Sequence, residues 1–447
     1  MIAPPPADQR GRKVRKRLSA DAFFALLRES FEKINDDRHK KALISLPDAL
    51  MSALAMFSLK DPSLLAFEAR RHDENMKALF GIIIVPSDTR MREILDPVDP
   101  RELRPAFADM FRVLQRGKAL EPFVFYQGHY LLSLDGTGYF SSQAIHCDSC
   151  LEKVNSKTGE ITYQHQMLGA VLLHPDLREV IPLAPEPIQK QDGTTKNDCE
   201  RNAAKRLLRD IRKDHPRLKL IVVEDALASN GPHIRELMDC QMHYILGVKS
   251  GDHQSLFDNV TRAFDEDKIT LVSWKEGDIW CEIGFINGVP LNDSNPDLLV
   301  NFLDYSEYDL NGNRVKYFSW VTDLRITQKN AHWLTRGGRC RWKIENETFN
   351  TLKNQGYHFE HNYGHGHQNL SVVFAMLMML AFLVDQAQQL CCALFRAVWE
   401  KVGSKRALWE QIRSHYWHFT FQSMQHLYEV ILYDLAKELP APTFDTS

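Results

Sequence analysis

The sequence has little net charge of either sign. Its 447 residues include 55 Lys and Arg and 58 Asp and Glu, which gives a formal net charge of −3. This balance excludes a uniformly basic surface, so contacts with nucleic acid would have to come from local clusters. One conspicuous basic cluster lies between Arg10 and Arg17, and a cluster of this kind is as often a solvated tail as a binding site.

Other absences narrow the class of protein. Without an internal repeat the chain is not a solenoid, and without a Walker-type or Gly-x-Gly phosphate loop it shows no sign of ATP dependence. The eight cysteines follow no secretory signal, which indicates free thiols and a cytoplasmic protein. The longest purely apolar stretch, Val372–Val384, is too short to cross a bilayer as a helix. We therefore expect a buried core helix and no membrane contact.

Residues from about 19 to 118 have the apolar periodicity of helices. Ser19 or Asp21 can cap a first helix, and Ser87 can cap a short helix that carries Arg90 and Arg92. Apolar residues recur at helical spacing in three stretches: Phe23, Phe24, Leu27 and Phe31; Leu50, Met51, Leu54 and Phe57; Leu103, Phe107, Phe111 and Leu114. A helical module with one basic helix fits a helix-turn-helix DNA-binding region or a plain bundle equally well.

After Pro122 the pattern changes to strands that alternate with helices. Apolar runs predict strands at 130–135, 166–174, 179–188, 218–225 and 243–249, and amphipathic helices are expected from Asn197 and Pro232. This order predicts a mixed α/β sheet covered by helices. A block at 251–328 has antiparallel-type runs at 270–274, 278–286 and 315–324, which indicates a β-rich insertion. Residues 341–354 and 370–435 are expected to be helical.

Two of the predicted strands end on an acid, at Asp135 and at Asp225. Ligands usually bind at the carboxyl ends of strands in open α/β sheets. If these two strands are parallel neighbours, the carboxylates emerge side by side and could share Mg²⁺, which prefers oxygen ligands. A single acid at a strand end is more often a turn or cap residue. Two of them in this order favour a metal site.

A third acid lies in the stretch Arg341-Trp-Lys-Ile-Glu345. Arg341 and Glu345 are four residues apart on a predicted helix, so a plain ion pair explains them. The functional alternative is that Glu345 holds a metal ion while Arg341 contacts a phosphate oxygen. Cleavage of a phosphodiester with two metal ions needs several carboxylates that converge on one point, and a third acid would complete such a set.

Four motifs occur in an order that resembles a known family. They are Asp135-Gly-Thr, Val223-Glu-Asp225, the strand Tyr244–Lys249 before a β-rich insertion, and Arg341–Glu345 ahead of Leu352-Lys353. In this order the chain resembles the bacterial insertion-sequence DDE transposases with a Tyr-Arg-Glu-Lys signature. The similarity spans roughly residues 125 to 385.

The resemblance implies a ribonuclease-H-like catalytic core, two Mg²⁺ ions (or Mn²⁺), and cut-and-paste movement of an insertion sequence. It implies that Asp135, Asp225 and Glu345 are the catalytic metal ligands, that Arg341 and Lys353 contact phosphates, and that Trp320 stacks on a flipped base. Such stacking is worth about 1–3 kcal/mol, although a strand Trp is more often part of a core. The implied partners are the inverted-repeat DNA of the transposon ends, target DNA and a second copy of the chain.

Two positions depart from the family pattern. Gly338 stands where the signature tyrosine is expected, and Lys353 follows Glu345 by eight residues instead of seven. Glu347 is therefore an alternative third acid. The sequence also contains a Cys147-x-x-Cys150 pair. Zinc needs four ligands and this pair supplies two, so the pair is either a part of a structural zinc site or two ordinary buried thiols.

These observations predict a multidomain α/β protein: a ribonuclease-H-like mixed sheet flanked by helices and interrupted by a β-rich insertion, with helical N- and C-terminal regions. The expected parts are a basic flexible tail (1–18), a helical DNA-binding region (19–120), the core (121–250 and 329–388), the insertion (251–328) and a C-terminal helical region (389–447). We expect a cytoplasmic transposase that is nucleoid-associated when bound to DNA. The alternatives are a nuclease without joining activity and an inactive DNA-binding derivative.

Overall fold

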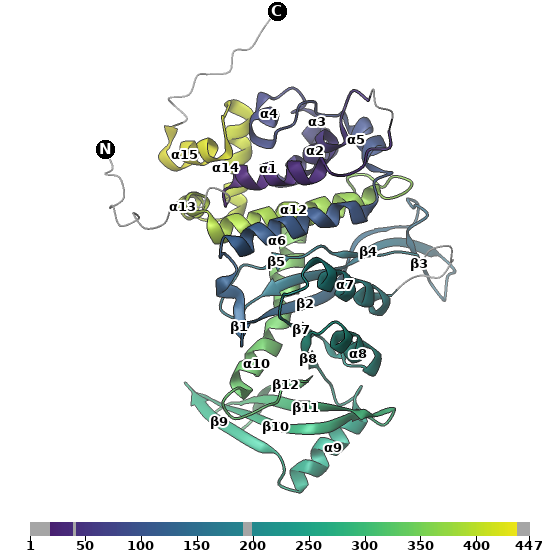
Figure 1. Cartoon of the computed structure of the whole chain (residues 1–447), viewed down its shortest axis with the longest axis vertical. Coiled ribbons are helices and arrows are strands. Elements are labelled where there is room, and N and C mark those ends of the chain that lie inside the picture. The colour runs from purple at the N-terminus through teal and green to yellow at the C-terminus, as the bar shows by residue number, and fades with distance from the viewer. Residues whose placement is uncertain (1–17, 39–41, 191–198, 436–447) are drawn as a thin grey trace, which may run out of the picture. The chain divides into compact units, whose positions relative to one another are not determined.

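The computed structural model describes residues 18–38, 42–190 and 199–435 (Figure 1). The chain divides into two units, which are treated separately below. The helical unit comprises Met1–Glu121, Ile145–Asp148 and Thr351–Ser447, and the sheet unit comprises Pro122–Ala144 and Ser149–Asn350. The basic cluster at 10–17 lies outside the described residues.

The first part of the helical unit contains the helices that the apolar periodicity predicts. They are α1 (Ala20–Phe31), α2 (Leu46–Ser58), α5 (Asp88–Leu95) and α6 (Arg104–Arg116). Two short helices that the sequence did not predict, α3 (Leu64–Glu68) and α4 (Glu74–Phe80), lie between α2 and α5 along the chain. Ser19 caps α1 and Ser87 caps α5, each through its side-chain oxygen. Asp21 does not cap α1. Its carboxylate instead accepts the N–H groups of Met424 and Gln425 at the start of α15 (Met424–Tyr433).

The long apolar helix α12 (Leu370–Cys391) lies in the same unit, with α11 (Asn350–Asn354) before it and α13 (Ala393–Val402) and α14 (Lys405–His418) after it. α12 has 22 residues and is long and apolar enough to cross a membrane by length and composition. The apolar stretch Val372–Val384 lies within this helix, which continues through buried polar residues such as Asp385 and Gln388. Its most apolar window is 94% buried, and α12 packs against α2.

One 12-stranded mixed sheet forms the centre of the sheet unit. Its strands are β1 (Val124–Tyr126), β2 (His129–Ser142), β3 (Leu151–Val154), β4 (Ile161–Leu173), β5 (Ile181–Pro182), β6 (Glu186–Ile188), β7 (Leu220–Glu224), β8 (His243–Gly247), β9 (Thr270–Glu276), β10 (Ile279–Asn292), β11 (Asn295–Tyr308) and β12 (Arg314–Thr322). The main order is β3-β4-β2-β7-β8-β12-β11-β10-β9.

The middle of this sheet is parallel and its two sides are antiparallel. β2 pairs with β7, and β7 with β8, in parallel, whereas β4 runs antiparallel to β2. β12 pairs antiparallel with β8, so the strands of the predicted insertion extend the same sheet. The sequence runs did not predict β11, which starts at Asn295-Pro-Asp and lacks a regular alternation of buried and exposed residues.

Helices of the sheet unit cover both faces of its central strands. They are α7 (Glu200–Asp214), α8 (Gly231–Asp239), α9 (Gln254–Asp265) and α10 (Ala331–Arg339), followed by a 3₁₀ turn (Cys340–Trp342) and a π-helix (Ile344–Phe349). Phe349 of the π-helix packs on Gly169, which pairs with Asp135, whereas Glu200 of α7 packs on the next residue, Gly136. Successive residues of a strand face opposite sides, so α7 and the π-helix lie on opposite faces.

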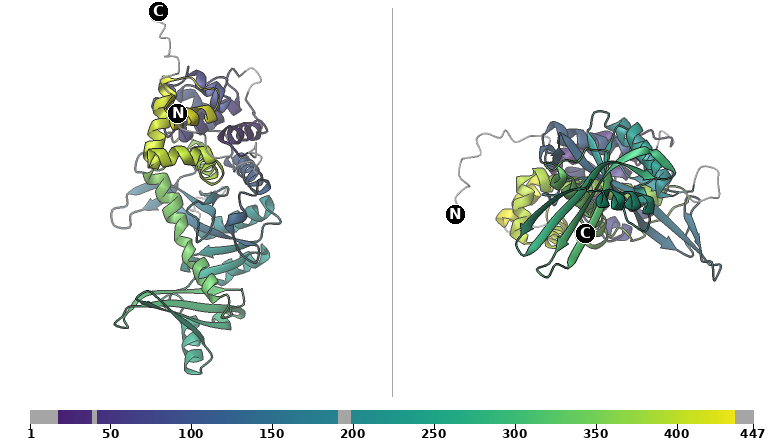
Figure 2. Two further views of the ribbon diagram at one scale, coloured as in Figure 1. Left: turned by 90° about the vertical axis from the view of Figure 1, so that its left-hand side faces the viewer. Right: turned by 90° about the horizontal axis from the view of Figure 1, so that it is seen from below.

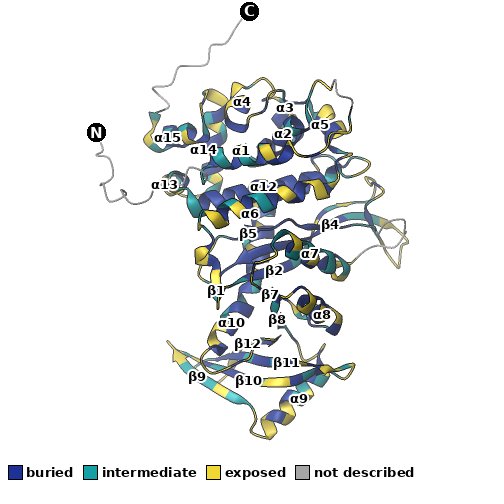
Figure 3. Cartoon of the chain, viewed as in Figure 1, coloured by how far each residue is buried: buried dark blue, intermediate teal, exposed yellow. Residues whose placement is uncertain are grey.

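Burial follows this arrangement. The central part of the sheet is buried, as Figure 3 shows: all of β7 and residues 131–134 of β2, 167–173 of β4 and 244–246 of β8, as expected for strands that are covered on both faces. The strands β9 to β12 carry more exposed residues, and α9 lies along β10 (Figure 2). The ring of Phe257 in α9 meets that of Phe302 at 5.5 Å in an edge-to-face contact.

Candidate active site

Two adjacent parallel strands bring Asp135 and Asp225 to the same level. The register pairs Ser133 of β2 with Val223 of β7, and each aspartate follows two residues later. Residues 131–134 of β2 and 220–224 of β7 are buried, as expected for strands that are covered on both faces. Asp225 accepts the N–H of Leu227 at 2.9 Å and so begins the short 3₁₀ turn after β7. Asp225 therefore follows the carboxyl end of its strand as predicted, whereas the prediction that a strand ends at Asp135 is wrong, because β2 continues to Ser142 in its pairing with β4.

Arg341 links Asp135 to Glu345. Its Nη1 lies 2.8 Å from Oε1 of Glu345 and 3.7 Å from Oδ2 of Asp135. Arg341 and Glu345 thus form the ion pair that their spacing predicts, and the same guanidinium group also lies near the carboxylate of Asp135. No hydrogen bond or ion pair of the Glu347 carboxylate is found among the described residues. Among the described residues, Arg341 thus contacts both Glu345 and Asp135, and Glu347 takes no part in these contacts.

Lys343, which the sequence did not single out, holds this segment on the sheet. Its buried ammonium donates to the carbonyl oxygens of His174, Pro175 and Leu177, in the loop after β4. Three acceptors match the three donors of an ammonium group. The residues on either side, Arg341 and Glu345, are therefore attached to a fixed backbone.

A fourth carboxylate, also missed in the sequence, belongs to Glu200 at the start of α7. An ideal Cβ on Gly136 would lie 1.9 Å from Oε1 of Glu200, so the carboxylate occupies the space beside the glycine that follows Asp135. Its only signal in the sequence is an acid in the first turn of an amphipathic helix, a position that acids commonly occupy in any helix.

Burial and neighbouring acids raise the pKa values of two of these carboxyl groups. Burial raises the pKa of Asp135 to about 7; Arg341 opposes this shift, while Glu345 and Glu200 add to it. Burial also raises the pKa of Glu200, with further contributions from Asp225 and Glu224. The predicted ligands Asp135, Asp225 and Glu345 offer carboxylate oxygens alone. Such a set fits a hard divalent cation such as Mg²⁺ or Mn²⁺.

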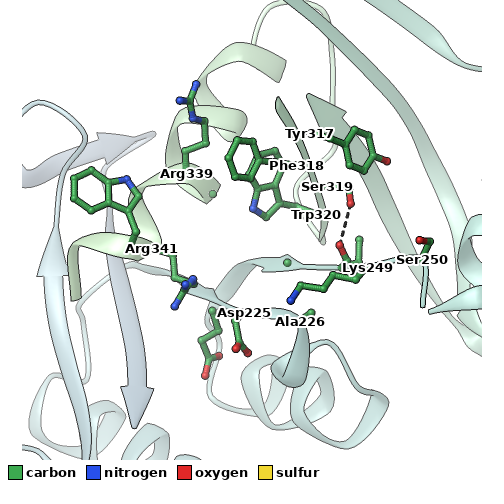
Figure 4. A pocket seen from close by; sticks show the side chains of 15 residues that line it. Asp225, Ala226, Lys249, Ser250, Tyr317, Phe318, Ser319, Trp320, Arg339 and Arg341 are labelled. Carbon is green, nitrogen blue, oxygen red and sulfur yellow. Dashed lines mark hydrogen bonds between the residues drawn. The ribbon is translucent and has the colours of Figure 1, made fainter. Parts of the chain in front are cut away.

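A cavity of about 420 Å³ adjoins Asp225 and is lined by aromatic and basic side chains (Figure 4). Lys249, two residues after β8, extends toward Asp225 in this view. Arg339 is the last residue of α10, and Arg341 lies in the 3₁₀ turn that follows. The ring of Phe318 stacks on that of Trp320 with 5.8 Å between centroids. Trp320 is only 5% exposed and Phe318 is 40% exposed, so Phe318 presents the accessible face.

The packing of Trp320 explains why position 338, where a tyrosine was expected, is a glycine. A Cβ on Gly338 would lie 2.5 Å from Cε2 and Nε1 of Trp320, so the indole fills the space that any larger residue would need. The two predicted features at 320 and 338 are therefore mutually dependent in this chain.

The remaining predicted residues are placed as follows. Lys353 lies in α11 of the helical unit and forms an ion pair with Glu360 at 2.8 Å. In the sheet unit, Cys150 Sγ lies 3.4 Å from His165 Nε2, and both residues are buried. Cys147 and Cys150 are both buried, and no disulfide bond of either is found among the described residues.

Carboxylates that lie just beyond the paired stretch of two parallel strands can hold the metal ions of phosphodiester chemistry. Residues 184–383 match the family model of the transposase DDE domain. This match supports a DDE transposase, that is, an enzyme that acts on DNA phosphodiesters. The matched segment contains Asp225 and Glu345 and begins after Asp135. A comparison with curated proteins found no match.

Proposed function

We propose that this chain is the transposase of an insertion sequence, which cleaves DNA at the ends of the element and joins them to a target. Asp135, Asp225 and Glu345 are its metal ligands, in a ribonuclease-H-like core. The observation that carries the proposal is the alignment of Asp135 with Asp225 on neighbouring parallel strands, with Arg341 between Asp135 and Glu345. The family match over 184–383 supports it independently.

Two bound Mg²⁺ or Mn²⁺ ions would activate the attacking oxygen and stabilise the leaving oxygen. The chain's own contribution is to fix the acids and to supply cations. Arg341 is held by Glu345 in the resting site and can turn its remaining N–H groups to a phosphate oxygen. Lys249 and Arg339 line the same cavity and offer further positive charge to a DNA backbone. The products are a cleaved strand end and then a joined strand, with no covalent protein–DNA link.

The cavity beside Asp225 suits an unstacked base. Its rings, Phe318 and Trp320, offer a stacking surface, and Arg339 lies 5.5 Å from the Phe318 ring centroid. A flipped base would gain about 1–3 kcal/mol from such stacking. The resemblance points to Trp320 for this role, with Lys353 as a second phosphate contact. A second copy of the chain and target DNA are the expected partners in the joining step.

The experiment that tests the proposal uses the DNA that flanks the gene as substrate. With Mg²⁺ the protein should cleave at inverted repeats, and pre-cleaved ends should be joined to a target plasmid. Asp135→Ala should keep end binding and lose both reactions, because it removes a metal ligand without touching the rest of the fold. Cleavage without joining would identify a nuclease. Binding without any Mg²⁺-dependent cleavage would identify a DNA-binding derivative.

A further inference from the structure

Cys150 and His165 lie side by side in the interior of the sheet unit. Cys150 directly precedes β3, which pairs with the part of β4 that comes just before His165. Sγ of Cys150 is 3.4 Å from Nε2 of His165, and the two residues are 0% and 1% exposed. The imidazole also lies beside the rings of Tyr139 and Phe140 in β2, with 5.8 Å between centroids in each case. The imidazole is therefore held in place by the strands around it.

Cys147 brings a second thiol to the same place. It is three residues before Cys150 in the loop that joins β2 to β3, so the covalent chain itself keeps the two thiols close. Cys147 is also buried, and the ligand atoms of Cys147, Cys150 and His165 all lie within 4.8 Å of one another. A single hydrogen bond explains a thiol beside an imidazole, but it does not require a second buried thiol at Cys-x-x-Cys spacing.

The atoms and their distances suit zinc. In a tetrahedral site with Zn–S of about 2.3 Å and Zn–N of about 2.0 Å, a sulfur and a nitrogen ligand are roughly 3.5 Å apart. This is close to the 3.4 Å between Cys150 and His165. Thiolates and imidazoles favour zinc over Mg²⁺, which prefers oxygen ligands. The cluster is thus chemically distinct from the carboxylates of Asp135 and Asp225.

We propose that Cys147, Cys150 and His165 bind a structural Zn²⁺ ion that fixes the loop between β2 and β3. The two thiols bind as thiolates and release their protons to solvent. The fourth ligand of the tetrahedron, a water molecule or a residue from another part of the chain, lies outside this loop. β3 has only four residues and is an edge strand of the sheet. A metal ion that only the folded chain can bind would add its binding energy to the stability of this edge.

The test is the zinc content of the full chain, purified under reducing conditions without an immobilised-metal column and measured by elemental mass spectrometry. The wild type should carry about one Zn²⁺ per chain. Cys150→Ser and His165→Gln should each carry at least tenfold less, because a lost ligand weakens binding at least as much as a lost partner of a ligand. Cys240→Ser, which removes another buried thiol of the sheet unit, is the matched control and should keep the wild-type zinc content.

Cobalt substitution of the wild type tests the site without any variant. Co²⁺ bound by two thiolates should give a charge-transfer band in the near ultraviolet, and Zn²⁺ should abolish it. A chelator should lower the melting temperature of the wild type and leave that of Cys150→Ser unchanged. A wild type that holds no zinc and gives no cobalt band would leave only a thiol–imidazole hydrogen bond and refute the proposal. Equal zinc contents in Cys150→Ser and Cys240→Ser would place the ion elsewhere and also refute it.

Discussion

Gly338 and Trp320 occupy one another's space in the sheet unit: the indole lies where a side chain at 338 would be, 2.5 Å from an ideal Cβ. Trp320 is held there by its pairing with Gly247 on β8 and by stacking on Phe318. Trp320 can therefore pack in this position only because residue 338 is a glycine.

The first prediction follows from this contact. Gly338→Ala should destabilise the protein by about 1–3 kcal/mol, the usual cost of overpacking a buried site. Gly338→Tyr, which would restore the family signature, should destabilise the protein more than Gly338→Ala does. The measurement is the midpoint of urea unfolding. Gly251→Ala is the matched control, because nothing lies within 4 Å of its Cβ position. Trp320→Phe should relieve part of the loss in Gly338→Ala, and no relief would contradict the contact.

A second prediction concerns a buried ion pair in the helical unit. Nζ of Lys60 lies 2.6 Å from Oδ2 of Asp385, and both side chains are almost completely buried. The hydroxyl of Tyr357 donates to the same oxygen. Lys60→Met leaves the carboxylate without its cation and should cost about 3–5 kcal/mol.

Chemical unfolding of three variants would test this pair. The double variant Lys60→Met, Asp385→Leu should recover most of the loss, since paired removal of buried charges is often nearly neutral. Glu410→Gln, which breaks the exposed pair with Arg406, is the control and should change stability by less than about 1 kcal/mol. A loss of similar size in Glu410→Gln and Lys60→Met would argue against a special role for burial.

The third prediction is a pH dependence. Nε2 of His233 lies 2.6 Å from the carboxylate of Glu224, the residue before Asp225. Burial lowers the pKa of His233, but the charge of Glu224 and the hydrogen bond to it together outweigh burial, and the net shift is upward. A histidine whose pKa is higher in the folded than in the unfolded state stabilises the fold fully below about pH 6.5, its unfolded value. That contribution is lost as the pH rises through the folded-state value.

Unfolding free energies of the wild type and of His233→Gln, measured between pH 5.5 and 9, would reveal this contribution. The unfolding free energy of the wild type should exceed that of His233→Gln at low pH, and this difference should shrink as the pH rises. His72→Gln, at an exposed histidine, should run parallel to the wild type. A constant difference between the wild type and His233→Gln across the whole range would mean that the pair is not charged.

The sequence predicted those parts of the site that depend on local patterns. Asp135 and Asp225 follow apolar runs that form neighbouring strands, and Arg341 and Glu345 are four residues apart and form an ion pair. Glu200 could not be predicted, because its relation to Gly136 arises only when α7 packs on β2. The same holds for Lys343, whose three acceptors follow β4, far away in the sequence.

The extra residue between Glu345 and Lys353 also has a physical explanation. Residues Ile344–Phe349 form a π-helix, whose hydrogen bonds enclose one residue more than those of an α-helix. A single inserted residue can therefore be absorbed in this turn without a break in the helical backbone. Sequence spacing alone cannot show this, because a π-turn has no distinct periodicity over six residues.

The choice between Glu345 and Glu347 leads to the fourth prediction. Glu345→Gln should reduce Mg²⁺-dependent cleavage of the flanking DNA at least a hundredfold, about the loss when one group that stabilises the transition state is removed. Glu347→Gln should cleave nearly as well as the wild type, because no contact joins it to Asp135 or Arg341 among the described residues. Both variants should bind the element's ends with unchanged affinity in a gel-shift assay without metal. The two substitutions are chemically identical and lie in the same π-helix, but only Glu345→Gln loses the ion pair with Arg341. Equal midpoints of urea unfolding for the two variants would therefore show that a difference in cleavage does not come from stability. Full loss of cleavage in Glu347→Gln, with activity retained in Glu345→Gln, would move the third metal ligand to position 347.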